Sequence, residues 1–391
     1  MKMFIDKNKQ LKSQSFGSDR IGSDRNGTAD YASFTKEFTQ IVRGAAILLM
    51  VYHHLFVIPE RINNDYINLL LFGSFDLQSY LACYAKICVG IYCFLSGLGI
   101  YYTLNAGDFT LRHQYRLIFK KIVLFIIQYN VIYLIFVTIG CAMGSFRFDW
   151  HYVTGIFAFE PTYYNGELWF VTTYLFLILS APILNYFFDR RKRLLYRILL
   201  ICIPVVVYGL YAGLSIICPE NILQYILSIV CGTSLSLLVP CVIIFIEGFL
   251  CSKYDIYTRI IKVLSGNGHL KIKLTIILLF SILLRILLVQ HETTMRWDFI
   301  AVPLFVTSIA PLIYNTKATK LFKFFGKHST NIWMLHTYWC YYLFQKVVLL
   351  PEISVLIYVW LLILSSASSF AINLIYKPIS EKVVKLIDQR C

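Results

Sequence analysis

Charge is scarce in this sequence. Only 15% of its 391 residues are Asp, Glu, Lys or Arg, whereas soluble domains average ~25%. Hydrophobic residues make up 58% of the chain and recur in long blocks. A soluble globular protein and a disordered scaffold are both excluded, because neither carries so much apolar sequence with so little charge.

Cysteine pairs and metal-ligand motifs are missing as well. None of the 11 cysteines forms a Cys-x-x-Cys pair, and no zinc or haem ligand spacing occurs. Most of the cysteines stand in apolar stretches, where a small buried hydrophobe is the ordinary role. The sequence therefore predicts neither a disulfide framework nor a bound metal.

An apolar leader and a nucleic-acid motif are also absent. Residues 1–30 are mostly polar and hold no apolar run that could act as a signal segment, so we expect residues 1–33 to be a disordered cytoplasmic tail. The net charge is +15. The basic residues stand at the edges of apolar stretches, where anionic lipid attracts them, so no nucleic-acid partner is expected.

Long apolar stretches are what the chain does have. Stretches of about twenty residues suit the ~30 Å hydrocarbon core of a bilayer. We therefore expect an all-α, polytopic membrane protein with ten transmembrane helices, a membrane domain over 34–380 and a short cytoplasmic tail over 381–391. The expected spans are 41–58, 80–104, 117–139, 168–187, 194–211, 225–250, 274–289, 299–314, 332–350 and 353–376.

Positive charge orients these spans, because Lys and Arg collect in short cytoplasmic loops. With ten spans and the N-terminus inside, 29 Lys and Arg residues fall in inside segments and 4 in outside loops. One span more or fewer early in the chain would destroy this asymmetry. We expect both termini in the cytoplasm and the protein in the cytoplasmic (inner) membrane of the cell.

An impermeant cysteine reagent tests this topology. The loop 189–197 holds five basic residues and is expected inside, whereas the long loop 141–166 is expected outside. A cysteine introduced at Lys192 should stay unlabelled in intact cells and react once the membrane is opened. Strong labelling of residue 192 in intact cells would reject the ten-span arrangement.

Ionisable residues inside the expected spans are the candidate functional residues, since charge in hydrocarbon is costly. They are Arg43, His53, His54, Lys86, Glu247, Arg285 and His336.

The first span is the most informative. Arg43 and His54 are 11 residues apart, which on an α-helix puts them on one face, about 20° apart in direction and about 16.5 Å apart along the axis. This alignment suits an enzyme that holds an anionic donor near the cytosol and transfers a proton further out. From spacing alone, an Arg43 that reaches lipid phosphate and a His54 that bonds a neighbouring helix fit equally well.

The chain also resembles the acyltransferase 3 family, the integral-membrane O-acyltransferases of surface carbohydrates. The resemblance begins with the segment from Arg43 to His54. It continues in the Leu-Ser-Gly segment within 89–98, the basic loop from Arg112 to Arg116, the opening Leu168-Trp169-Phe170 of the fourth span, and the block 329–336 that ends in His336. In one departure, Tyr92 and Cys93 stand where the family commonly has paired Phe. That departure changes the packing around Ser96 and leaves the chemistry untouched.

The resemblance implies acyl transfer from a cytosolic acyl-CoA, commonly acetyl-CoA, to a hydroxyl of an exported or lipid-linked carbohydrate. It implies that His54 is the catalytic histidine and that Arg43 is its partner, which also helps to hold the donor. CoA carries several negative charges, so Arg112 and Arg116, four residues apart near the cytosol, are expected to bind its phosphates. Acyl-CoA is the expected cosubstrate, without a metal.

Three further residues are candidates for binding a substrate: Lys86 and Trp169 for the carbohydrate, and His336 for the donor. Each has an ordinary alternative. Lys86 could reach the lipid headgroups, Trp169 fits an aromatic belt at the outer membrane face, and His336 could hydrogen-bond a neighbouring helix.

Two other readings concern buried polar groups. Glu247 and Arg285 are expected to neutralise each other between spans six and seven. Ser96 either belongs to a small-residue helix contact, which we favour, or accepts the acyl group covalently.

A polysaccharide or small-molecule transporter or flippase without transferase activity is the main alternative, because it too would have many helices and a few buried charges. Inverted repeats with matched broken helices would be its signature, and the sequence has no such symmetry. A non-catalytic sensor or assembly protein would leave the alignment of Arg43 and His54 to chance. The expected partners are membrane lipid and the carbohydrate acceptor. A homodimer and enzymes of polysaccharide biosynthesis are the protein partners left open.

Overall fold

The computed structural model describes residues 34–62, 66–106, 110–158, 160–190, 235–266, 268–289, 295 and 297–389. The expected tail 1–33, the expected span 194–211, the first part of 225–250 and most of the loop 189–197 lie outside these residues.

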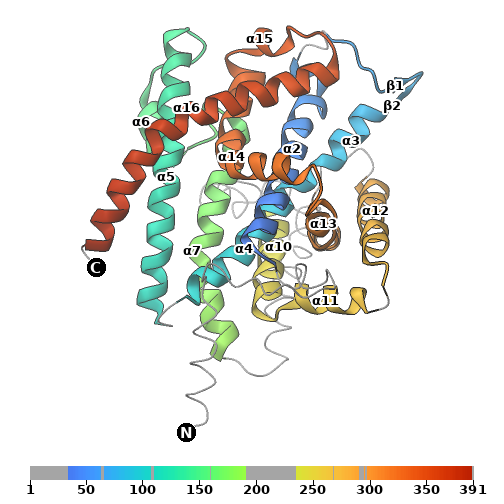
Figure 1. Ribbon diagram of the computed structural model, residues 1–391. Coiled ribbons are helices and arrows are strands. Elements are labelled where there is room, and N and C mark those ends of the chain that lie inside the picture. The colour runs from blue at the N-terminus through green and yellow to red at the C-terminus, as the bar shows by residue number, and fades with distance from the viewer. Residues whose placement is uncertain are drawn as a thin grey trace, which may run out of the picture.

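Helices make up nearly all of the described chain, so the all-α prediction is confirmed (Figure 1). The helices are α2 (Lys36–Phe56), α3 (Leu77–Ala85), α4 (Ile87–Leu104), α5 (Leu111–Ala142), α6 (Trp150–Ile156), α7 (Trp169–Arg190), α10 (Leu235–Lys253), α11 (Ile256–Ser265), α12 (Leu270–Val289), α13 (Asp298–Ile313), α14 (Thr319–Thr337), α15 (Gln345–Leu349) and α16 (Ser354–Gln389). Short turns η2 (Pro59–Ile62), η3 (Gly166–Leu168) and the π turn η4 (Tyr338–Tyr342) connect some of them. A small antiparallel hairpin of β1 (Leu71–Phe72) and β2 (Phe75–Asp76) projects at one end.

Among the described residues, four helical segments are long and apolar enough to cross a membrane, and the protein is accordingly an integral membrane protein. They are Leu77–Leu104, which joins α3 to α4, Leu111–Ala142, Gly166–Phe188 and Ser354–Gln389. A fifth arises if α10 and α11, which are bent by 70° at their junction, form one broken span. The count of ten spans and the side of each terminus stay predictions.

The ninth expected span, 332–350, is not one helix. Helix α14 begins earlier, at Thr319, and ends at Thr337, where the π turn η4 redirects the chain into the short helix α15. The turn is held by Asn165, whose amide donates to the Thr337 hydroxyl at 2.8 Å. Helix α16 in turn continues through most of the expected tail 381–391. Its end is fixed to α5, because Lys120 Nζ lies 2.7 Å from an oxygen of Asp388.

Glycines bring two pairs of helices into backbone contact. Gly44 and Gly326 join α2 to α14, since a Cβ added at either would lie within 2.0 Å of a backbone oxygen of the partner helix. Gly97 and Gly248 do the same for α4 and α10. Small residues permit such close packing in membrane helices. These contacts fix α2, which carries Arg43 and His54, against α14, which carries His336.

A buried ion pair corrects one of the sequence predictions. Arg285 of α12 is fully buried and places Nε 2.7 Å from Oδ1 of Asp298, at the start of α13. Its guanidinium also donates to the carbonyl of Cys83 in α3. The predicted pairing of Glu247 with Arg285 is therefore wrong. Asp298 is closer because α12 and α13 are consecutive and pack side by side.

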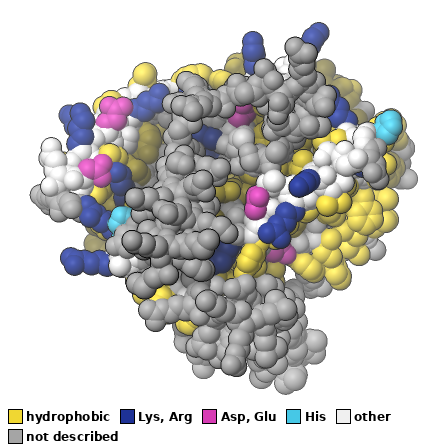
Figure 2. Space-filling model, turned by 60° about the horizontal axis from the view of Figure 1, so that its bottom comes forward, with side chains coloured by type: hydrophobic (Ala, Val, Ile, Leu, Met, Phe, Trp, Pro, Cys, Tyr) yellow, Lys and Arg dark blue, Asp and Glu magenta, His cyan; other side chains and the backbone are white. Residues whose placement is uncertain are grey.

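Basic side chains gather at one end of the bundle. Helix α11 lies across this end, and α5 and α12 begin there (Figure 1). Viewed from this end, Lys and Arg appear around the described surface, beside a hydrophobic flank (Figure 2). The first two turns of α5 and α12, together with α11, carry Arg112, Arg116, Arg259, Lys262, Lys271 and Lys273. All six belong to segments that the charge distribution assigns to the cytoplasm.

Candidate active site

Helix α2 carries both Arg43 and His54. It begins after Thr35, whose hydroxyl accepts a hydrogen bond from the Phe38 amide and so caps the helix. Arg43 stands in its first half and His54 in its last turn. Because one unbroken helix holds both, their separation along its axis is the expected one of about 16.5 Å.

A cleft lies beside the first half of α2. Two adjoining pockets share Arg43, Tyr92, Ser96 and Tyr174, and one of them also reaches Lys121 of α5. Two cations and two tyrosines therefore face one space, which suits an anionic ligand. The Ser96 hydroxyl donates to the Tyr92 carbonyl of its own helix at 2.6 Å.

Aromatic side chains also line this cleft. Phe170 of α7 and Trp333 of α14 belong to one of its two pockets and meet edge to face, with ring centroids 5.5 Å apart. One turn beyond Trp333 on α14 stands His336. The cleft and the histidines are thus neighbours along α14.

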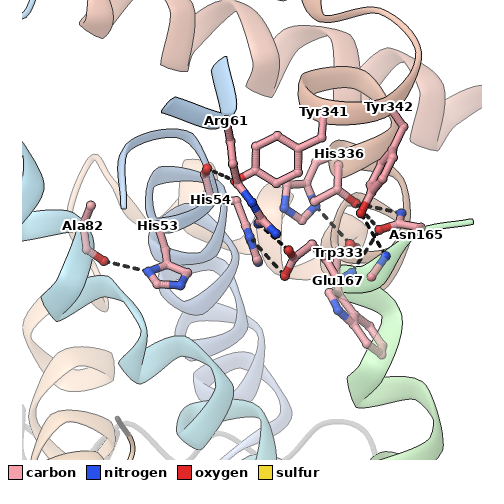
Figure 3. A network of polar contacts seen from close by, with 12 residues as sticks. His53, His54, Arg61, Ala82, Asn165, Glu167, Trp333, His336, Tyr341 and Tyr342 are labelled. Carbon is pink, nitrogen blue, oxygen red and sulfur yellow. Dashed lines mark hydrogen bonds and ion pairs between the residues drawn. The ribbon is translucent and has the colours of Figure 1, made fainter. Parts of the chain in front are cut away.

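His54 faces a carboxylate (Figure 3). Its Nδ1 lies 3.6 Å from Oε2 of Glu167, which stands in η3 just before α7. Catalytic contacts of this length commonly tighten when a substrate binds. The other oxygen of Glu167 accepts from Arg61 at 2.5 Å. Burial opposes the charged form of Arg61, but the bond to Glu167 outweighs it and raises the pKa of the guanidinium.

His336 lies against His54, with ring centroids 5.1 Å apart. Its Nδ1 donates to the carbonyls of Ile332 and Trp333 at 2.8 and 2.9 Å. Both bonds lie within α14, so in the described chain this side chain does not form the alternative hydrogen bond to a neighbouring helix. The proton on Nδ1 leaves Nε2 as an acceptor, and that buried atom has no hydrogen-bond partner in the described chain. Since α14 starts at Thr319, His336 stands near the end of its helix, rather than near the beginning as the sequence suggested.

A buried latch positions Glu167. The side chains of Asn165 and Thr337, both fully buried, hydrogen-bond each other at 2.8 and 3.1 Å. The Tyr342 hydroxyl accepts from the Gly166 amide at 2.9 Å. The Asn165 side chain also accepts from the amide of Glu167 itself. The η3 turn is thereby attached to the end of α14, next to His336.

The two adjacent histidines have different surroundings (Figure 3). His53 donates from Nδ1 to the Ala82 carbonyl of α3 at 2.8 Å. The backbone carbonyl of His54 instead accepts a hydrogen bond from the Tyr341 hydroxyl. Of the pair, His54 is the one beside a carboxylate.

Lys86 and Trp169, both predicted to bind the acceptor, meet each other. Lys86 occupies the break between α3 and α4, and its Nζ stands over the Trp169 ring, 5.6 Å from the centroid. Trp169 is two residues from Glu167. The structure thus brings His54, His336, Trp169 and Lys86 to one end of the helix bundle.

Arg112 and Arg116 stand apart from these groups. They lie in the first turns of α5 with exposed side chains, and neither lines the cleft beside Arg43. Lys121, further along the same helix, does line it. Within the described part of the chain, no group of three His, Cys, Asp or Glu side chains could hold a metal ion.

Comparison with known families bears on this arrangement. The model of one family, described as an acyltransferase domain, matches residues 37–374. The chain belongs to the acyltransferase 3 family. No curated protein and no solved structure matches it. The match includes α2, α4, α7 and α14, the helices that carry the cleft and the histidines, so this is a membrane acyltransferase.

Sequence reasoning missed Glu167 in this acyltransferase 3 member. A glutamate one residue before the Leu-Trp-Phe block lies outside the expected span 168–187, so the search for charges inside spans did not reach it. The sequence feature that marks Glu167 is its position between Gly166 and the block that begins at Leu168. A carboxylate at the end of an expected span, beside aromatic residues, is as good a candidate as a charge within a span.

The Glu167 contact is testable. A charge-assisted hydrogen bond is worth about 1.5–3 kcal/mol, so Glu167→Gln should lower acyl transfer roughly 10- to 100-fold. The measurement is the transfer rate of the purified variant. Glu60→Gln, which removes an exposed carboxylate near Arg61, is the matched control and should retain the rate. Equal rates for the two variants would separate Glu167 from the chemistry.

Proposed function

We propose that this protein transfers an acyl group, most simply acetyl, from cytosolic acyl-CoA to a carbohydrate hydroxyl at the outer side of the cytoplasmic membrane. The observation that carries the proposal is the layout of α2. A cation-lined cleft lies beside its first half, and a histidine with a carboxylate partner stands at its end.

The mechanism is a direct transfer. Nε2 of neutral His54 takes the proton of the acceptor hydroxyl as the oxygen attacks the thioester carbonyl, and the Glu167 carboxylate stabilises the imidazolium that forms. The tetrahedral intermediate then collapses, the C–S bond breaks, and the CoA thiolate recovers the proton from Nε2. The products are the carbohydrate ester and CoA with a free thiol.

The donor enters from the opposite end. Its phosphates meet Arg43 and Lys121 in the cleft, with Arg112 and Arg116 at the rim, and its slender arm extends past Phe170 and Trp333 toward His54. A covalent intermediate on Ser96 has less support, because its hydroxyl already donates to the Tyr92 carbonyl. Ser96 is also next to Gly97, whose contact with α10 supports the packing role.

Acetylation by the purified protein tests the proposal. Protein in lipid nanodiscs is given acetyl-CoA labelled in the acetyl group and a lipid extract from the native cells. Transfer of label to glycan, with release of CoA thiol, is expected. A flippase would move glycan across a vesicle membrane without either product, and a sensor would do neither.

Donor binding by the rim arginines gives a separate prediction. Replacing both Arg112 and Arg116 with Ala should weaken acyl-CoA binding several-fold, and added salt should weaken binding to the wild type, because exposed charge contacts are screened. Calorimetric titration with acetyl-CoA measures both. The exposed pair Lys382 and Lys385 on α16 provides the control double variant. If donor affinity is unchanged without Arg112 and Arg116, these residues are topology signals only.

A further inference from the structure

In the described part of the chain, Lys86 has no ion-pair partner. It is half-buried at the break between α3 and α4, and its ammonium lies over the Trp169 ring. A charge within a membrane domain is costly and usually pairs with an opposite charge or serves a ligand. The cation–π contact with Trp169 offsets part of that cost. A negatively charged group on a bound ligand would offset more of the cost of burying the Lys86 charge.

The surroundings of Lys86 belong to the acceptor end of the site. One turn before it, the Ala82 carbonyl binds His53, the neighbour of His54. Trp169, beneath it, is two residues from Glu167. The Lys86 charge acts on both imidazoles. Donor phosphates are bound far away, because Arg43 is about 16.5 Å from His54 along α2.

The neighbouring ion pairs already have their partners. Glu167 is paired with Arg61 at 2.5 Å. The deeply buried Arg285 is paired with Asp298. In the described chain, Lys86 has no carboxylate within ion-pair distance.

We infer that the acceptor is an anionic carbohydrate, whose carboxylate or phosphate pairs with Lys86 over Trp169 while its hydroxyl reaches His54. This inference rests on the proposed function and deepens it by naming the substrate class. Trp169 would offer its edge and remaining face to the sugar ring. A neutral glycan would leave Lys86 unpaired in the complex as well.

The test uses membranes of the native cells, deleted for the gene and supplied with wild-type or variant protein. Acetyl-CoA labelled in the acetyl group is added, and the labelled product is separated by anion exchange after any lipid carrier is cleaved at its sugar linkage. A labelled product that the column retains carries an anionic group. Loss of retention after phosphatase treatment identifies a phosphate on the glycan, and loss of retention after methyl esterification identifies a carboxylate.

Three variants complete the test. Lys86→Met should raise the acceptor KM roughly tenfold or more, since one charge-assisted bond is worth about 1.5–3 kcal/mol, with the acetyl-CoA KM unchanged. Lys86→Arg should stay within a few-fold of the wild type. Lys346→Met, which removes an exposed lysine of α15, should have no effect.

Three outcomes would contradict the inference, and they differ in what they say about the proposed function. A neutral labelled glycan overturns the inference and leaves the proposed function intact. A Lys86→Met variant with a lower kcat and an unchanged acceptor KM also overturns it, because Lys86 would then act on the transition state. If the wild type transfers no label at all, the proposed function fails and the inference falls with it.

Discussion

Replacing His54 with Ala is expected to lower acyl transfer by about 10²- to 10⁴-fold, the usual contribution of a general base. A sugar hydroxyl is a weak nucleophile at neutral pH, and of the two histidines on α2 it is His54 that faces a carboxylate, with Nδ1 3.6 Å from Glu167. The variant should still insert and fold, because in the described chain the His54 side chain makes no hydrogen bond that holds α2 to another helix. The hydrogen bond at this position runs from the Tyr341 hydroxyl to the His54 carbonyl, which the variant keeps. The measurement is glycan acetylation in cells deleted for the native gene, with protein level checked by immunoblot.

His53 provides the matched control. It is adjacent in sequence and has the same side chain, but its Nδ1 donates to the Ala82 carbonyl of α3. His53→Ala should cost about 1 kcal/mol of stability for the lost hydrogen bond and keep measurable acetylation. Near-normal acetylation by a well-expressed His54→Ala protein would remove His54 as the base and, with it, most of the mechanism.

A single methyl group at Gly97 is expected to deplete the folded protein. A Cβ at this position would lie 1.9 Å from the backbone oxygen of Phe245, so α4 and α10 would have to separate. Overpacking of this kind costs about 1–3 kcal/mol or more, and a backbone oxygen in a helix cannot move away as a flexible side chain can. Gly97→Ala should therefore lower the yield of monodisperse protein and its thermal stability in detergent.

The control for Gly97 lies two residues along the same helix. A Cβ at Gly99 meets nothing within 4 Å, so Gly99→Ala should match the wild type in yield and stability, with a small gain from the better helix propensity of Ala. If both variants behave alike, the contact between α4 and α10 is looser than the structure indicates.

The sequence predicted most of the helices and one half of the site. Apolar block length gave α2, α5 and α7 to within several residues, because a membrane imposes a length on its helices. The 11-residue spacing gave the shared face of Arg43 and His54, since helical geometry is fixed. Block length failed at 332–350, where the π turn after Thr337 depends on a bond to Asn165, far away in sequence.

The missed parts of the site share a cause. Glu167, the latch that holds it and the pairing of Arg285 with Asp298 all depend on which helices are neighbours. Neighbour relations come from contacts such as Gly44 with Phe322 and Gly97 with Phe245. A single sequence marks these glycines but does not say which backbone each one meets.

Helix α2 is unbroken between Arg43 and His54 and packs closely against α14 at Gly44 and Gly326. In the proposed mechanism, this rigid helix sets the distance from the phosphate end of the donor to the reacting carbonyl, at about 16.5 Å along the axis. A thioester on a truncated arm would then be too short to reach both ends at once. Deleting one residue within 44–53 would shorten this distance by only about 1.5 Å but would rotate His54 by about 100° relative to Arg43. The proposed mechanism therefore tolerates a change of acyl group or sugar, which meet at the His54 end, more readily than a change in the length between Arg43 and His54.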